Sequence, residues 1–199
     1  MRGAPIGAVR EGIAQMVRDL QGDPFALETV ALSVITFSTG AEQVVPLTDI
    51  LRFRAPDLAA KGKTELGAGL RLLLDKIAQE VRTSSPDIKA DWKPICFLLS
   101  DGGPSDAWIT PANEVCARHN ARKVFMTAVG FGRNVHVDKL KRVTPQVVIS
   151  ETAEPVAFSR FLQWASTSIS QSCQAAAMRD PTDPNLSSFP AESGFRLVP

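Results

Sequence analysis

Asp101 and Thr64 are two oxygen-bearing residues at positions where a folded chain could bring them together. Asp101 directly follows the apolar run 95–99 and precedes two glycines, and Thr64 stands just before an expected helix over 65–82. A hard divalent cation prefers oxygen ligands, so a carboxylate and a hydroxyl suit Mg²⁺. The two residues predict a cation site, although each alone has a simpler explanation, Asp101 as a turn residue and Thr64 as a helix N-cap.

Five further residues near these two positions could contact a partner protein. Asp106 could instead cap a helix that begins near Trp108, or accept a hydrogen bond behind the metal ligands. Trp108 is expected to be either exposed or partly buried, and Lys63 could hold an acidic partner or simply be solvated. The predicted partner contacts are Ser100, Gly102, Asp106, Trp108 and Lys63.

Nucleophilic catalysis and nucleotide hydrolysis find less support in the sequence. The two histidines, His119 and His136, are not accompanied by a Gly-x-Ser-x-Gly nucleophile motif. Residues 62–64, Gly-Lys-Thr, match the end of a phosphate-binding loop, but Asp57 stands where that loop requires its first glycine. We therefore do not expect either chemistry.

The composition is that of an ordinary globular protein and excludes several classes of partner. The 199 residues are 44% hydrophobic and 22% charged, with a formal net charge of +1. This balance predicts binding neither to nucleic acid nor to an anionic membrane surface. The sequence has no run of eighteen apolar residues, no apolar secretory leader and no Cys-x-x-Cys pair among its three cysteines, so we expect a cytoplasmic protein.

Helical and strand patterns alternate along the chain, which predicts an α/β fold with a doubly wound, mostly parallel sheet and helices on both faces. Pro46 marks a short strand that fits one antiparallel edge. This domain is expected over 1–174, followed by a proline-rich flexible tail over 175–199. Expected helices are 4–20, 65–82, 109–121, 136–143 and 155–172, and expected strands are 28–37, 43–47, 95–99, 123–129 and 146–149.

Five stretches of the sequence together resemble a known family: MRGAPIGAVREGI, ALETVALSVITFS, KGKTELGAGLRLL, LLSDGGPSDAW and FMTAVGFG. Over about residues 1–172 the chain is similar to von Willebrand factor type A (vWA) domains, most closely the bacterial tellurium-resistance group called TerY. The resemblance implies a vWA, Rossmann-like fold with a metal-ion-dependent adhesion site (MIDAS). In that site Thr64 and Asp101 would bind Mg²⁺, Mn²⁺ or Ca²⁺, and an acidic side chain of a partner would complete the coordination.

One part of the family pattern has no counterpart in the sequence. The family's central first strand ends in Asp-x-Ser-x-Ser, directly before the stretch that here begins at Met1. Without those ligands we expect metal binding to be weak or absent. We also expect strands 28–37 and 95–99 to lack their common neighbour. A chain start placed too far downstream is the favoured explanation; the alternatives are a strand donated by a partner, by another copy or by the tail, or direct pairing of the two strands.

The resemblance implies a protein–protein interaction module without enzymatic activity. Its expected context is a scaffold in bacterial tellurite or stress resistance or in phosphorylation signalling, with a kinase or phosphatase of the same system as a candidate partner. Two alternatives stay open. A metal-dependent phosphoesterase could use Asp101, although the sequence offers no second carboxylate cluster. A metal-free structural subunit of a complex would need neither metal ligand.

Overall fold

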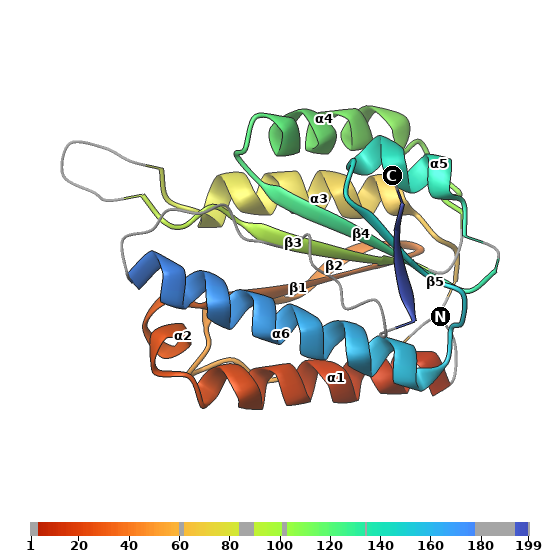
Figure 1. Cartoon of the computed structure of the whole chain (residues 1–199). Coiled ribbons are helices and arrows are strands. Elements are labelled where there is room, and N and C mark those ends of the chain that lie inside the picture. Colours follow the sequence, from red (N-terminus) through yellow and green to blue (C-terminus); the bar gives the residue numbers. More distant parts are fainter. Residues whose placement is uncertain are drawn as a thin grey trace. The chain divides into compact units, whose positions relative to one another are not determined.

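The computed structural model describes residues 4–59, 62–83, 90–100, 103–133, 135–177 and 194–198. They form an α/β structure with parallel strands, which confirms the expected fold class (Figure 1). The helices are α1 (Ala4–Gln21), α2 (Pro24–Thr29), α3 (Leu66–Glu80), α4 (Ile109–Asn120), α5 (Val137–Val143) and α6 (Pro155–Ala177). The strands are β1 (Ala31–Ser38), β2 (Gly40–Asp49), β3 (Ile95–Ser100), β4 (Phe125–Phe131), β5 (Val147–Ser150) and β6 (Phe195–Val198).

The described strands form two separate sheets. Strands β1 and β2 pair with each other, and the second sheet has the order β3-β4-β5-β6. Strand β4 runs parallel to both of its neighbours, with Leu98 of β3 opposite Ala128 and Val147 of β5 opposite the same residue. Strands β1 and β3 are therefore each the last strand of a described sheet. Among the described strands, β1 does not pair directly with β3.

The chain divides into two compact units. The first unit comprises Met1–Val34, Val44–Ala60 and Thr152–Arg196, and it contains α1, α2 and α6. Here α1 lies along α6 (Figure 1). The helices approach closely at Gly12, where an added Cβ would come within 2.5 Å of Leu162 Cδ1. The buried rings of Phe158 and Phe161 fill the core of this unit.

The second unit comprises Ile35–Gln43, Lys61–Glu151 and Leu197–Pro199, and it holds β3, β4 and β5 together with α3, α4 and α5. On α3, Leu66, Leu70 and Leu74 recur every four residues, so they share one face of the helix. All three are buried in a cluster that also contains Met126 of β4 and Val115 of α4. This core fixes the loops at the carboxyl ends of the strands.

Three elements differ from the sequence-based expectations. Residues 28 and 29 end a short helix rather than begin a strand, because Asp23 caps α2 with its side chain and Pro24 occupies the first turn. Strand β2 begins at Gly40, three residues before the expected strand. Within the segment expected to be a flexible tail, Phe195–Val198 form β6 and extend the sheet beyond β5; residues 178–193 lie outside the described residues.

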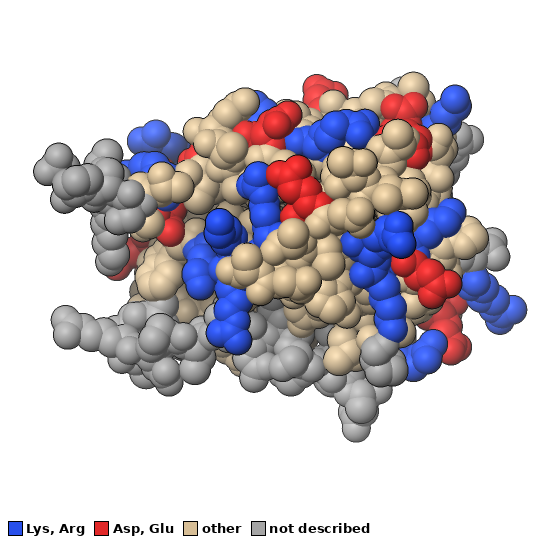
Figure 2. All heavy atoms as spheres, turned by 90° about the horizontal axis from the view of Figure 1, so that it is seen from above, with Lys and Arg blue, Asp and Glu red and all other residues tan. Residues whose placement is uncertain are grey.

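The described surface carries charges of both signs. In the view of Figure 2, Lys and Arg side chains occur across the face together with Asp and Glu side chains. Among the described helices, none is long and apolar enough to cross a membrane. The mixture of charges on this face agrees with the formal net charge of +1.

Candidate functional site

The loops that precede α3 and follow β3 are joined by a backbone hydrogen bond. The N–H of Ser105 donates to the carbonyl oxygen of Thr64 at 2.9 Å, and the N–H of Glu65 donates to the carbonyl of Ser38, at the end of β1, at 3.0 Å. The Glu65 carboxylate in turn accepts a hydrogen bond from the N–H of Gly40 at 2.8 Å. All of these residues belong to the second unit, so three loops meet around Thr64 within one compact body.

The turn after β1 presses against the loop that carries Thr64. Gly62 has a φ of +80°, a conformation that favours glycine, and a Cβ at this position would collide with the Thr39 hydroxyl. The backbone N–H of Lys63 donates a long hydrogen bond to the same hydroxyl oxygen, with a nitrogen–oxygen distance of 3.4 Å. Glycine at position 62 therefore allows the close approach of the two loops, and the Lys63 side chain is left exposed to solvent.

Asp106 holds the first turn of α3. Its two carboxylate oxygens accept hydrogen bonds from the N–H groups of Gly67 and Ala68, each at 2.9 Å. Arg71 lies 3.7 Å from one of those oxygens. The first N–H groups of a helix have no carbonyl partner within the helix, so a carboxylate here accepts hydrogen bonds that would otherwise be unmade. Its negative charge also interacts favourably with the positive end of the helix dipole. Asp106 thus fastens the loop after β3 to the helix after Thr64.

Two capping interpretations from the sequence are wrong. One interpretation of Asp106 was a cap of α4, but Trp108 occupies the N-cap position of that helix and makes no side-chain capping bond; the other was a hydrogen-bond acceptor, and Asp106 accepts bonds at the start of α3. Thr64 was a candidate N-cap of α3, but that position belongs to Glu65. The contact between Asp106 and Gly67 spans 39 residues, so no local pattern reveals it. Trp108 is partly buried against the core of the second unit.

The structure places the neighbours of Asp101 at this site, but not Asp101 itself. Asp101 and Gly102 lie outside the described residues, and their role as metal ligand and partner contact stays a prediction. Ser100 is buried at the end of β3. On the other side, a Cβ on Gly103 would lie 2.9 Å from a ring carbon of His136 and 3.1 Å from the Lys139 amine. Gly103 therefore lies beside the start of α5.

The described residues offer a divalent cation only part of a coordination shell. They contain no group of three or more His, Cys, Asp or Glu side chains that could hold a metal ion. Thr64 is half-buried and supplies one neutral hydroxyl, whereas the nearby Glu65 carboxylate is engaged with Gly40. One neutral hydroxyl does not hold a divalent cation by itself, so binding here would depend on Asp101, which lies outside the described residues, and on ligands from water or a partner.

Two groups that could act as nucleophile or base are held neutral in the second unit. His119 Nδ1 accepts a hydrogen bond from the N–H of Met126 at 3.0 Å, and burial lowers the pKa of the imidazole. Burial also raises the pKa of the Cys96 thiol to about 12. Since a thiol must ionise to attack, this raised pKa disfavours Cys96 as a nucleophile at neutral pH. Both side chains have structural roles in the packing around β3 and β4.

Comparison with known proteins supports the fold. No protein-family model matches the sequence, and no curated protein matches it. Among solved structures, proximal thread matrix protein 1 from the mussel byssus is similar, with a TM-score of 0.58 and 17% identity over 81% of this chain. A form of that protein described as having a zinc-occupied MIDAS motif has a TM-score of 0.56 and 17% identity over 80% of this chain. This chain spans 41% of the length of each.

A third solved structure, the ArnB paralog VWA2 from Sulfolobus acidocaldarius, is more distant, with a TM-score of 0.42 and 15% identity over 78% of this chain and 39% of its own. At these identities the likeness concerns the fold alone. The strand order, the parallel pairing and the mussel structures agree on one conclusion: the chain has a vWA-type fold.

Proposed function

We propose that this chain is a protein-interaction module that binds an acidic partner through the loops around Thr64. The hydrogen bond between Ser105 and Thr64 carries the proposal, because it joins the two loops on which the predicted ligands Thr64 and Asp101 stand. Lys63 is exposed beside this junction and would favour a carboxylate. A divalent cation shared between Thr64, Asp101 and an acidic side chain of the partner would add a charge-specific contact.

The ion is proposed from the oxygen ligands of this site, and the partner from the resemblance to a known family. We propose Mg²⁺ or Mn²⁺ as the ion, bound weakly until the partner supplies further oxygen ligands. The resemblance to the tellurium-resistance group suggests a cytoplasmic scaffold in bacterial stress signalling, with a kinase or phosphatase as the partner. One mussel structure carries zinc in its MIDAS motif, which supports a divalent ion on this fold without selecting among metals.

A metal titration tests the proposed site. We expect weak, saturable binding of Mn²⁺ to the intact chain, and loss of that binding in both Thr64→Ala and Asp101→Ala. Asp57→Ala is a matched control, because this carboxylate is exposed in the first unit and pairs only with Arg10 among the described residues. No binding by the intact chain, or equal binding by all variants, would contradict the cation site.

The absence of catalysis is tested separately. We expect no turnover of a generic phosphate ester in the presence of Mg²⁺ or Mn²⁺, since the described residues hold no carboxylate cluster that could bind two metals. Turnover by the intact chain that disappears in Asp101→Ala would establish the phosphoesterase instead.

A further inference from the structure

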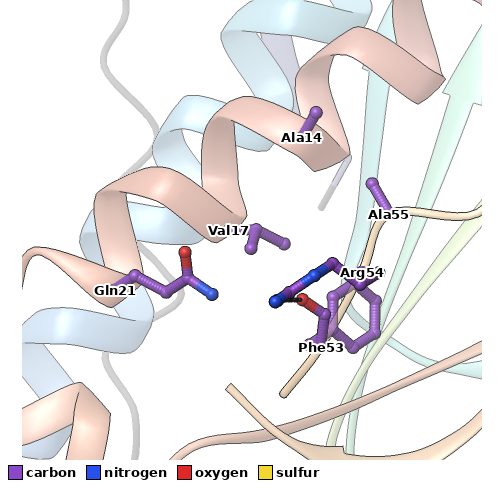
Figure 3. A pocket seen from close by; sticks show the side chains of 6 residues that line it. All are labelled: Ala14, Val17, Gln21, Phe53, Arg54 and Ala55. Atoms are coloured by element: carbon purple, nitrogen blue, oxygen red, sulfur yellow. Dashed lines mark hydrogen bonds between the residues drawn. The ribbon is translucent and has the colours of Figure 1, made fainter. Parts of the chain in front are cut away.

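Trp92 is the most exposed aromatic side chain among the described residues, at 59% exposed. It belongs to the second unit and lies just before β3. The hollow between α1 and the segment after β2 in the first unit differs from it, because the residues of its floor, Val17 and Phe53, are already buried (Figure 3). Trp92 instead presents apolar surface to solvent, and tryptophan is enriched among the residues that dominate the binding energy of protein interfaces.

The segment that carries Trp92 is fixed on both sides. On one side Asp91 forms an ion pair with Arg82 at 2.7 Å, and its carboxylate also accepts a hydrogen bond from the backbone N–H of Arg82 at 2.8 Å. On the other side the carbonyl of Pro94 accepts a hydrogen bond from the N–H of Phe125, at the start of β4, at 2.8 Å. Ordering a segment costs binding free energy, and less of that cost arises where the segment is already held in place.

Two lysines accompany Trp92 at this edge of the sheet. Lys93 and Lys123 each precede by two residues a member of the strand pair formed by Ile95 and Phe125, so the two lysines stand next to each other. The Lys93 ammonium lies 5.8 Å from the centre of the Phe125 ring. Both lysines are exposed, and neither forms an ion pair with a carboxylate of the described residues. Their charges are therefore available to a partner.

A third cation comes from the turn after α4, which ends on the same side as the starts of β3 and β4 (Figure 1). Arg122 is exposed and has a φ of +54°, a left-handed conformation in which glycine is the usual residue after a helix. The carboxylates of Asp91 and Glu114 are already paired with Arg82 and Arg118. Among the described residues, this edge therefore carries an excess of positive charge around an exposed aromatic ring.

We propose that Trp92, Lys93, Arg122 and Lys123 form a docking surface for an acidic protein segment that carries an aromatic side chain. The partner's ring would pack against Trp92, and its carboxylates would meet the three cations. Single-stranded nucleic acid fits less well, because it stacks successive bases on several aromatic side chains. In the described part of the second unit, Trp92 is the one exposed aromatic residue.

The docking surface is separate from the candidate cation site. Thr64 lies among the loops at the carboxyl ends of the strands, whereas Trp92 precedes the amino end of β3. Binding at Trp92 requires no metal ion, so the proposal stands or falls independently of the function proposed for the loops around Thr64.

Fluorescence anisotropy of a labelled peptide, Asp-Glu-Asp-Phe-Glu-Asp, tests the proposal on the full chain in the presence of EDTA, which removes any bridging cation. We expect saturable binding that weakens about tenfold when the peptide's Phe is replaced by Ala, and about tenfold in Trp92→Ala. Both changes together should weaken binding no more than either alone, because they remove the same contact. Ile109→Ala is the matched control, since Ile109 is also exposed in the second unit but begins α4 at its opposite end.

The cations are tested with a double variant, Lys93→Gln with Lys123→Gln. It should weaken peptide binding at least about tenfold and reduce the dependence of binding on salt, because both charges are exposed and screened by ions. Lys63→Gln, beside Thr64, should leave binding unchanged. The thermal unfolding midpoint of each variant shows whether the fold is retained.

Three results would overturn the proposal: no saturable peptide binding by the intact chain, undiminished binding by Trp92→Ala or by the double lysine variant, or loss of binding in Lys63→Gln. The last result would assign the peptide to the loops around Thr64. Binding of oligothymidylate that depends on Trp92, without binding of the peptide, would replace the protein segment with single-stranded nucleic acid.

Discussion

Strands β3 and β4 are neighbours with similarly apolar sequences, yet they differ in burial. Six of the seven residues of β4 are buried, whereas β3 has only Leu98 and Ser100 buried among its six. Strand β4 has a hydrogen-bonded neighbour on each side, and β3 stands at the end of the described sheet. Parallel sheets are normally covered on both faces and their apolar strands are central. The burial of a strand therefore depends on its place in the sheet as well as on its residues.

The largest expected effect compares a core residue of β4 with a residue of β3. Met126 is 1% exposed within the core of the second unit, and Met126→Ala should lower the free energy of unfolding by about 2–5 kcal/mol. Leu99 is half-buried, so Leu99→Ala should cost clearly less. Denaturant unfolding of both variants measures the difference. If Leu99→Ala were as costly as Met126→Ala, the outer edge of β3 would be covered in solution, for instance by a second copy.

The position of a strand along the chain can be predicted from the sequence, but its neighbours in the sheet cannot. The apolar run 95–99 locates β3 to within one residue, because strand residues and glycine-rich turns are local signals. The order of the strands is a long-range property, so the separation of β1 from β3 followed only from the family resemblance. Strand β6 was missed because its four residues follow a proline-rich segment and its position depends on pairing with β5.

At the candidate site, too, the sequence predicts local features but not contacts between residues far apart in the chain. Glycines and a threonine before a helix indicated where the loops lie, but the hydrogen bond from Ser105 to Thr64 joins residues 41 positions apart (105 − 64). For Asp106 the local pattern favours a cap of the nearer helix, since sequence patterns describe caps over three or four residues. Its actual partners, Gly67 and Ala68, are brought near by packing of the second unit.

An intermediate effect concerns the loop that leaves β3. Asp106→Ala removes the acceptor of two N–H groups at the start of α3 and should cost about 1–2 kcal/mol in the free energy of unfolding. Asp106→Asn keeps one acceptor oxygen and should cost less. Asp57→Ala removes an exposed ion pair and should cost at most about 0.5 kcal/mol. A loss for Asp106→Ala no larger than that for Asp57→Ala would mean that the loop is not anchored through this carboxylate.

The smallest effect concerns the start of β4, where the His119 imidazole accepts a hydrogen bond from Met126. Burial lowers the pKa of His119 below the ordinary 6.5, so the unfolded chain binds a proton more readily than the folded one. This contribution to stability is complete above pH 6.5 and is lost as the pH falls from 6.5 through the lowered pKa. The effect should be modest, because the side chain is only partly buried. His119→Gln retains an acceptor but cannot titrate, and it should flatten the fall of the free energy of unfolding over this range. If the free energy of unfolding fell by the same amount in the variant, other titratable groups would cause the pH dependence, and the burial of His119 beside β4 would contribute nothing to it.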